Sequence, residues 1–157
     1  MFGWIILGVM VVLIAIVLIR TLTLKPTPAK TLQLEFEKSE RATKYGKQLA
    51  KMIQDETISS RFGQDMSKFD KFHETLEALF PNVHKTCEKY NLDGSLLYKW
   101  KGKSDKNPIL FMSHQDVVEA TGEWEHEPFS GDIDEDGNVW GRGTVDTKGS
   151  LFCIFTA

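Results

Sequence analysis

The chain has 157 residues, a formal net charge of −3, four histidines and two cysteines. Its lysines and arginines are dispersed along the chain, so the sequence lacks the concentrated basic footprint of a nucleic-acid-binding protein. Two cysteines, Cys87 and Cys153, are too few for a disulfide framework, and we read both as buried core thiols.

The first predicted element is a hydrophobic helix near the N-terminus. From Phe2 to Ile19, 18 consecutive residues carry no charge and no strong hydrogen-bonding group. A helix of this length spans about 27 Å, close to the thickness of a bilayer's hydrocarbon core. Because the segment is apolar on every side, we predict a transmembrane anchor over residues 1–24 that contacts lipid through residues 2–24. A buried soluble helix and a cleaved signal peptide are the alternatives.

Residues 25–38 are predicted to be a linker that leaves the bilayer, since they contain Pro26 and Pro28. The cations Arg20, Lys25 and Lys30 follow the apolar run. By the positive-inside rule they favour a cytoplasmic position for the following domain, but three charges leave the orientation open.

Residues 39–157 are predicted to form one folded domain that begins with two amphipathic helices. The first runs from about Ser39 to Ile53, and the second follows a break at residues 59–63 and ends at Pro81, with Ser67 and Asp70 as its capping pair. Apolar residues at helical spacing define the buried faces: Tyr45, Leu49, Met52 and Ile53 in the first helix, and Phe69, Phe72, Leu76, Leu79 and Phe80 in the second.

The segments that follow have the pattern of strands. Residues 83–90 and 95–101 are predicted to pair as a hairpin around the turn at 91–94. Residues 109–112 are apolar on both alternating faces, which is typical of a strand covered on both sides. The sequence therefore predicts an α/β fold, a three-layer α/β/α sandwich preceded by one transmembrane helix.

Two potential metal-site residues follow the central predicted strand directly. His114 and Asp116 stand two positions apart, so on an extended chain their side chains point the same way, and the carboxylate can orient the imidazole. The carboxyl ends of strands are where open α/β sheets place their ligands. A lone His-x-Asp pair, however, is more often structural than metal-binding.

A second cluster strengthens the interpretation. Residues 132–140 read as a turn that feeds a strand, and residues 151–155 as a helix. Asp146 lies at the junction between them, where it can serve as a helix N-cap, a metal ligand or both. His73 and His126 are interpreted as non-ligating, His73 as a partly exposed helix residue and His126 as part of a polar loop.

The second cluster partly matches two other kinds of binding site. Asp132, Asp134 and Asp136 match the first half of a calcium loop, but Gly143 occupies the position of its bidentate glutamate. The glycines around Arg142 resemble part of a dinucleotide fingerprint, but Asp146 stands where the third glycine belongs, and its charge would repel a pyrophosphate.

Three ordered segments together resemble a known family. They are residues 111–118 (FMSHQDVV), Trp124 with residues 128–131 (PFSG), and residues 139–149 (VWGRGTVDTKG). The pattern is similar to the zinc metallopeptidase superfamily of aminoacylase, carboxypeptidase S and succinyl-diaminopimelate desuccinylase, and is most similar to its carboxypeptidase S branch of N-acyl amino acid hydrolases. With weaker likeness at residues 49–59 and 79–83, the resemblance covers about residues 39–157.

The resemblance implies a function and a ligand set. His114 would bind one of two zinc ions, Asp116 would be the catalytic carboxylate that orients it, and Asp146 would bridge the two ions. The substrate would be a small peptide or an N-acyl amino acid, cleaved at its amide bond. The glutamate base, the remaining ligands and the lid domain are expected beyond residue 157, so this portion alone is expected to be inactive. The alternative is a membrane-tethered pseudoenzyme or calcium-binding module.

Overall fold

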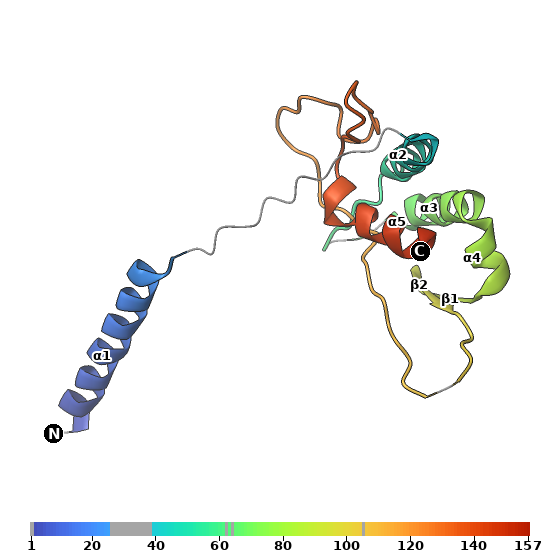
Figure 1. The fold of residues 1–157 in the computed structure, drawn as a ribbon. Helices are drawn as coiled ribbons and strands as arrows, with labels where there is room; N and C mark the ends of the chain where they lie inside the picture. The colour runs from blue at the N-terminus through green and yellow to red at the C-terminus, as the bar shows by residue number, and fades with distance from the viewer. Residues whose placement is uncertain (1, 26–38, 62, 64, 105) are drawn as a thin grey trace. The chain divides into compact units, whose positions relative to one another are not determined.

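The structure, a computed structural model, describes residues 2–25, 39–61, 63, 65–104 and 106–157. The chain divides into two compact units, Met1–Phe36 and Glu37–Ala157. Helices, a short sheet and long loops make up the described residues, so the fold is mixed helix and strand (Figure 1). The predicted linker lies almost entirely outside the described residues, and the domain boundaries given above remain predictions.

The first unit contains the helix α1, Phe2–Thr23. It is long and apolar enough to cross a membrane, and a signal sequence would satisfy the same criteria. The helix extends one turn beyond the purely apolar run, because the hydroxyl groups of Thr21 and Thr23 donate to the carbonyl oxygens of Val17 and Ile19. Such back-bonding lets threonine remain helical without an unpaired polar group.

The second unit begins with α2 (Glu40–Ile53), which confirms the first predicted helix. Ser39 caps it, since its hydroxyl oxygen accepts a hydrogen bond from the amide of Ala42 at 3.1 Å. The helix α3 is Met66–Leu79, and its cap was predicted wrongly. Asp65, not Ser67, is the N-cap, because its carboxylate accepts from the Ser67 amide at 3.1 Å and satisfies a free amide of the first turn.

The core forms where α2 and α3 pack with the last helix, α5 (Gly149–Thr156). This confirms the helix predicted over residues 151–155. The buried cluster consists of Met52, Phe72, Leu76, Phe80 and Phe152. Phe152 makes edge-on ring contacts with Tyr45 and Phe80, at centroid distances of 5.4 and 5.8 Å. Aromatic pairs in this geometry add stability beyond their buried area.

Between α3 and the hairpin, the strand predicted over residues 83–90 is wrong in its first half. These residues begin with α4, Pro81–Thr86, which has Pro81 in its first turn. Proline is favoured there because its φ is already helical and the missing N–H has no helical partner. Pro81 therefore ends α3 and starts α4, and the strand β1 occupies only Glu88–Leu92.

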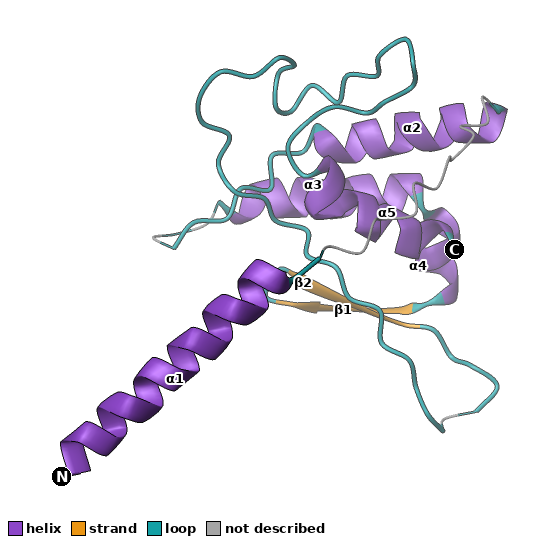
Figure 2. Ribbon diagram, turned by 60° about the vertical axis from the view of Figure 1, so that its left-hand side comes forward, coloured by secondary structure: helices purple, strands orange, loops and turns teal. Residues whose placement is uncertain are grey.

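The predicted hairpin is confirmed, with β1 paired antiparallel to β2 (Ser95–Lys99). Leu92 lies opposite Ser95, so the turn consists of Asp93 and Gly94, both with positive φ. The side-chain oxygen of Asn91 accepts from the Gly94 amide at 2.9 Å and closes the turn. Figure 2 shows this small sheet beside α4.

The strand predicted over residues 109–112 is not formed. Ile109, Leu110, Phe111 and Met112 are 69% to 80% exposed and have no strand assignment. A strand requires a hydrogen-bonded neighbour, and within the described ranges the only sheet is the β1–β2 pair. The three-layer sandwich is accordingly not seen, and the strand expected after residue 132 is reduced to a single bridge between Ile133 and Val139.

Three single-residue predictions are also wrong. His73 is only 5% exposed rather than partly exposed, since its α3 face turns toward the loop at Gln115. Cys153 is exposed, because the neighbouring Phe152 takes the core-facing position of α5. Cys87 is half-buried rather than a core residue.

We predict that Leu76→Ala lowers the free energy of unfolding of the second unit by about 2–5 kcal/mol, the range for truncating a buried leucine. Leu76 is 1% exposed and belongs to the buried cluster. Leu92→Ala is the matched control, since Leu92 is 59% exposed and its loss should change stability by about 0.5 kcal/mol or less. Denaturant unfolding of the chain in detergent, followed by tryptophan fluorescence, measures both; equal losses would contradict the core described above.

Candidate metal centre

The candidate site forms where the segment at residues 113–117 meets the turn that precedes α5. Val117 fixes the first segment by pairing with residues 57–59 in a parallel bridge. Its amide donates to the Thr57 carbonyl at 2.9 Å, and its carbonyl accepts from the Ser59 amide at 3.0 Å. This short pairing attaches the segment carrying His114 and Asp116 to the chain that follows α2.

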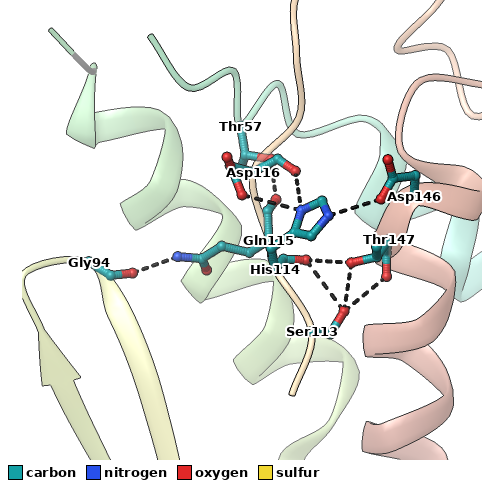
Figure 3. A network of polar contacts seen from close by, with 8 residues as sticks. All are labelled: Thr57, Gly94, Ser113, His114, Gln115, Asp116, Asp146 and Thr147. Carbon is teal, nitrogen blue, oxygen red and sulfur yellow. Dashed lines mark hydrogen bonds and ion pairs between the residues drawn. The ribbon is translucent and has the colours of Figure 1, made fainter. Parts of the chain in front are cut away.

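His114 is held between two carboxylates. Its Nε2 lies 2.9 Å from the Oδ1 of Asp146, and its Nδ1 lies 2.9 Å from the backbone oxygen and 3.2 Å from the Oδ1 of Asp116 (Figure 3). Because the backbone oxygen of Asp116 only accepts, the hydrogen of a neutral imidazole belongs on Nδ1. The Nε2 lone pair then faces Asp146.

Asp146 lies in a helical turn, η1 (Thr144–Lys148), that leads into α5. It does not cap α5, because Lys148 occupies the N-cap position. Its φ of −116° and ψ of 91° are not helical, and this local departure turns the carboxylate toward His114 instead of along the helix axis. Of the roles that the sequence left open for Asp146, capping of α5 is not adopted, and its side chain lines the cavity.

Hydroxyl groups next to each of these residues join the two segments. The Thr147 hydroxyl donates to the His114 carbonyl at 3.0 Å, and the Ser113 hydroxyl donates to the Thr147 carbonyl at 3.1 Å. Figure 3 shows these bonds on the side of His114 away from Gly94. Neither Ser113 nor Thr147 was predicted from the sequence, where their only signal is that each directly neighbours a candidate ligand.

A buried lysine, Lys148, holds the turn that carries Asp146. Lys148 is fully buried, and its ammonium donates to the carbonyl oxygens of Met52 at 3.0 Å and Asp55 at 2.6 Å. The ammonium also lies 4.7 Å from the centre of the Phe72 ring. Burial lowers the pKa of Lys148 to about 8, against the opposing charge of Asp55. The turn that carries Asp146 is thereby fixed to the end of α2.

Gly143, just before this turn, has a φ of 91°. A Cβ at this position would lie 2.7 Å from Cγ1 of Val117, closer than side-chain contacts allow. Glycine is therefore needed both for the backbone conformation and for the close approach of the two segments.

The site lies in an open cavity of about 670 Å³. Its lining includes His114, Asp116, Trp140, Arg142, Val145 and Asp146. An imidazole and carboxylates are donors that suit zinc and other divalent cations. Within the part of the chain that the structure describes, no cluster of three or more His, Cys, Asp or Glu side chains is arranged to hold an ion alone. The residues present thus fit part of a metal-ligand set.

The electrostatics of the pair favour a charged imidazole in the metal-free site. Partial burial by itself lowers the pKa of His114, but hydrogen bonds to the Asp116 carbonyl and the Asp146 carboxylate, with both carboxylate charges, raise it above 6.5 overall. Because a proton and a cation compete for Nε2, the site should bind metal more weakly as the pH falls.

The acidic turn at residues 132–140 is satisfied by its own donors. Asp134 accepts hydrogen bonds from the Asp136 and Asn138 amides, the Asn138 carboxamide and the Trp140 indole. These bonds, led by the Asn138 carboxamide, lower the pKa of Asp134 to about 2. Both carboxylate oxygens accept hydrogen bonds inside a hairpin turn, which leaves fewer lone pairs for a calcium ion.

His126 packs against this turn. Its Nδ1 lies 3.3 Å from a carboxylate oxygen of Asp132, and its ring stacks on Trp140 at a centroid distance of 4.5 Å. Arg142 lies 4.8 Å above the Trp124 ring and donates to the Glu119 carbonyl at 3.4 Å. These contacts shape the wall of the cavity.

Comparison with known proteins gives a consistent result. Residues 110–157 match the profile of peptidase family M20/M25/M40. The chain is 46% identical over 115 residues to the probable carboxypeptidase S-like 2 of Dictyostelium discoideum and 41% identical over 115 residues to the carboxypeptidase S of Saccharomyces cerevisiae. It is 38% identical over 156 residues to the N-fatty-acyl-amino acid synthase/hydrolase PM20D1 of Xenopus tropicalis.

These three matches cover 68%, 68% and 92% of this chain, but only 22%, 20% and 30% of the respective relatives. The resemblance predicted from the sequence is confirmed, for a region that corresponds to less than a third of each relative.

We predict that, in the metal-free protein, Asp146→Asn lowers the pKa of His114, because the raised pKa depends in part on the Asp146 carboxylate. A raised histidine pKa means that the contact stabilises the fold below the unfolded-state pKa and loses this effect as the pH rises through the folded-state value. NMR titration of the imidazole carbon-bound protons measures the shift. Asp93→Asn, a charge loss in the hairpin turn, is the control; an unchanged pKa in Asp146→Asn would contradict the contact.

Proposed function

We propose that the chain contributes to a zinc-dependent hydrolase that cleaves the amide bond of a peptide or an N-acyl amino acid, and the match of residues 110–157 to the profile of peptidase family M20/M25/M40 supports this. The observation that carries the proposal is the 2.9 Å approach of His114 Nε2 to Asp146 Oδ1. Segments 32 positions apart in sequence deliver an imidazole and a carboxylate to one cavity. The names of the relatives support the reaction class.

In this proposal His114 and Asp146 are metal ligands, and Asp116 is the catalytic carboxylate that orients the His114 imidazole. By keeping a hydrogen on Nδ1, the Asp116 carbonyl and carboxylate leave Nε2 free to bind a cation. Zinc in such a site supplies a Lewis acid and lowers the pKa of bound water to about 7. A site for two ions needs more ligands than these residues provide, which the proposal assigns to other parts of the protein.

The proposed substrates share an amide flanked by a carboxylate, as in a peptide C-terminus or an N-acyl amino acid. The names carboxypeptidase S and N-fatty-acyl-amino acid synthase/hydrolase describe relatives that act on these two groups of compounds. In this chain the cavity beside His114 is lined by Trp140, Val145 and Arg142, which combine apolar surface with a cation. We also propose that the complete catalytic domain is a three-layer α/β/α sandwich in which residues 109–112 form a strand.

Two rival functions remain, a pseudoenzyme without catalysis and a calcium-binding module. The engaged oxygens of Asp134 argue against calcium at the acidic turn. The convergence of His114 and Asp146 argues against loss of the metal site, because a protein that no longer binds metal has no need to hold an imidazole and a carboxylate together in a cavity.

We further propose that α1 anchors the protein in a lipid bilayer as a single-pass helix. All its described residues are exposed, and they are overwhelmingly apolar, so none of the described residues of its unit covers this surface. In water such a surface is unfavourable by about 25 cal/mol per Å², whereas a bilayer satisfies it.

The function is tested with the full-length product of the gene that encodes this chain. We predict bound zinc, by elemental analysis after dialysis, and hydrolysis of an N-acyl amino acid or a blocked dipeptide. His114→Ala and Asp146→Ala should each remove zinc and lower kcat/KM by more than about 100-fold, the upper range for losing a mere outer-sphere partner.

His84→Ala is the matched control, a histidine of the same unit whose Nε2 lies 3.3 Å from the Tyr98 hydroxyl and which does not line the cavity. It should retain zinc and activity. Zinc binding without hydrolysis of either substrate class would support the pseudoenzyme, and binding of calcium without zinc would overturn the hydrolase.

For the membrane anchor, we predict that replacing Leu13 and Ile14 with arginine moves the protein from the membrane to the soluble fraction on alkaline extraction. Each central arginine opposes insertion by about 2.5 kcal/mol or more. Thr23→Arg, at the end of α1, should leave the protein in the membrane fraction. Mass spectrometry of the mature protein provides the decisive alternative, since loss of α1 would identify it as a cleaved signal sequence.

A further inference from the structure

Gln115 stands between two of the candidate site residues and points the other way. Successive side chains of an extended segment alternate between faces, so His114 and Asp116 share one face and Gln115 takes the opposite one. Figure 3 shows the Gln115 side chain reaching toward Gly94 while His114 faces Asp146. The residue is half-buried beneath the cavity, between α3 and the hairpin turn.

Every polar group of Gln115 other than its backbone N–H has a hydrogen-bond partner. Its Oε1 lies 2.9 Å from Nε2 of His73, its Nε2 donates to the Gly94 carbonyl at 2.6 Å, and its backbone carbonyl accepts from the Thr57 hydroxyl at 2.6 Å. His73 is 5% exposed and Thr57 is fully buried. The three contacts reach three different parts of the unit.

The chemistry of these atoms fixes the direction of each bond. Because the carboxamide nitrogen donates to the Gly94 carbonyl, the oxygen faces His73 and must accept from its Nε2–H. The His73 hydrogen thus serves this contact, and the buried imidazole acts as a donor rather than as a ligand. A buried polar pair with both partners satisfied resists rearrangement, since breaking it leaves unpaired groups.

Gln115 shares its two peptide planes with His114 and Asp116. A backbone rotation that carried the Gln115 side chain away from His73 would therefore turn both neighbouring residues on the cavity side, and the bond from the buried Thr57 hydroxyl to the Gln115 carbonyl opposes it as well. The ring of His114 is 49% exposed and its partner carboxylate on Asp146 is 84% exposed, so packing around these side chains cannot hold them. The restraint must come through the backbone, and the buried face of this segment supplies it.

We propose that Gln115 and His73 form a positioning pair that holds His114 toward Asp146 and so raises the affinity of the site for a divalent cation. Neither residue touches the ion or the substrate. The pair acts through the backbone on either side of Gln115. This inference rests on the proposed metal-dependent function, and it assigns a role to a histidine that the sequence identified only as part of a helix.

The test measures cobalt affinity and the visible cobalt spectrum of the full-length gene product, using chelator competition. Gln115→Met and His73→Leu keep size and remove the hydrogen bonds. Each should weaken Co²⁺ binding about tenfold, the scale for losing an outer partner of a ligand, and should change the visible spectrum. Because the two residues act as one unit, the double variant should weaken binding no more than the stronger single variant.

Conservative rescue separates positioning from simple support of the fold. His73→Gln places an amide donor near the position of Nε2, so it should restore most of the affinity lost in His73→Leu. Gln54→Ala is the matched control. The Gln54 carboxamide also donates to a backbone carbonyl, that of Ser130 at 2.9 Å, but it does not contact Gln115 or His73. It should leave cobalt affinity and spectrum unchanged.

Several results would overturn the proposal. They are unchanged cobalt affinity in folded Gln115→Met, additive losses in the double variant, and loss of affinity in His73→Gln as large as in His73→Leu. Thermal unfolding of each variant defines the folded fraction used for normalisation.

If the wild-type protein binds neither cobalt nor zinc, the proposed function fails. The effect of Gln115 on the position of His114 is then tested in the metal-free protein. A nuclear Overhauser contact between the His114 ring and the β-protons of Asp146, expected from the 2.9 Å approach of Nε2 to Oδ1, should be present in the wild type and lost in Gln115→Met. Its persistence would overturn the pair independently of metal.

Discussion

The buried ammonium of Lys148 is the constraint on which the rest of the second unit depends. Lysine is almost never fully buried unless its charge is paired, because an uncompensated buried charge is very unfavourable. Here the carbonyl oxygens of Met52 and Asp55 receive the ammonium at the end of α2, where the helix dipole is negative. The Phe72 ring supplies a further favourable contact from the core.

This single contact couples stability to the geometry of the site. Lys148 ends the turn that carries Asp146 and directly precedes α5, whose Phe152 enters the hydrophobic cluster. The position of Asp146 therefore follows from how α5 packs on α2 and α3. The core and the candidate metal centre are in this sense one structure, and the turn between them cannot move without disturbing both.

The sequence predicted the elements whose signals are local. The apolar periodicity that identified α2 and α3, and the Gly94 turn that identified the hairpin, depend on residues close together in the chain. Asp65 was missed as a cap because Ser67 offered an equally plausible one two residues later. The helix α4 was missed because Val83 favours strands. Pro81 was interpreted only as the end of the preceding helix, but proline is equally suited to the first turn of a new one.

What the sequence did not predict is non-local. Nothing near Lys148 signals that its ammonium will be buried, since its acceptors lie 93 and 96 positions earlier. His73 and Gln115, 42 positions apart, give no shared local pattern either. The strand predicted at residues 109–112 is absent because a strand also depends on non-local partners. An apolar pattern predicts burial only where a partner surface exists. His114, Asp116 and Asp146 were identified because motif resemblance carries non-local information that periodicity does not.

The exposure of the site decides what holds it together. Two opposite charges about 4 Å apart attract by only about 1 kcal/mol in water, and exposed pairs contribute about that much or less after side-chain ordering. With half of the His114 side chain and most of the Asp146 side chain in solvent, their attraction alone is too weak to fix the geometry. The positions of the two side chains must therefore be fixed by buried neighbours. Lys148 holds the turn that carries Asp146, and His73 holds the segment that carries His114. The proposed metal site would thus be formed before any ion arrives, so ion binding would not have to supply the free energy of assembling it.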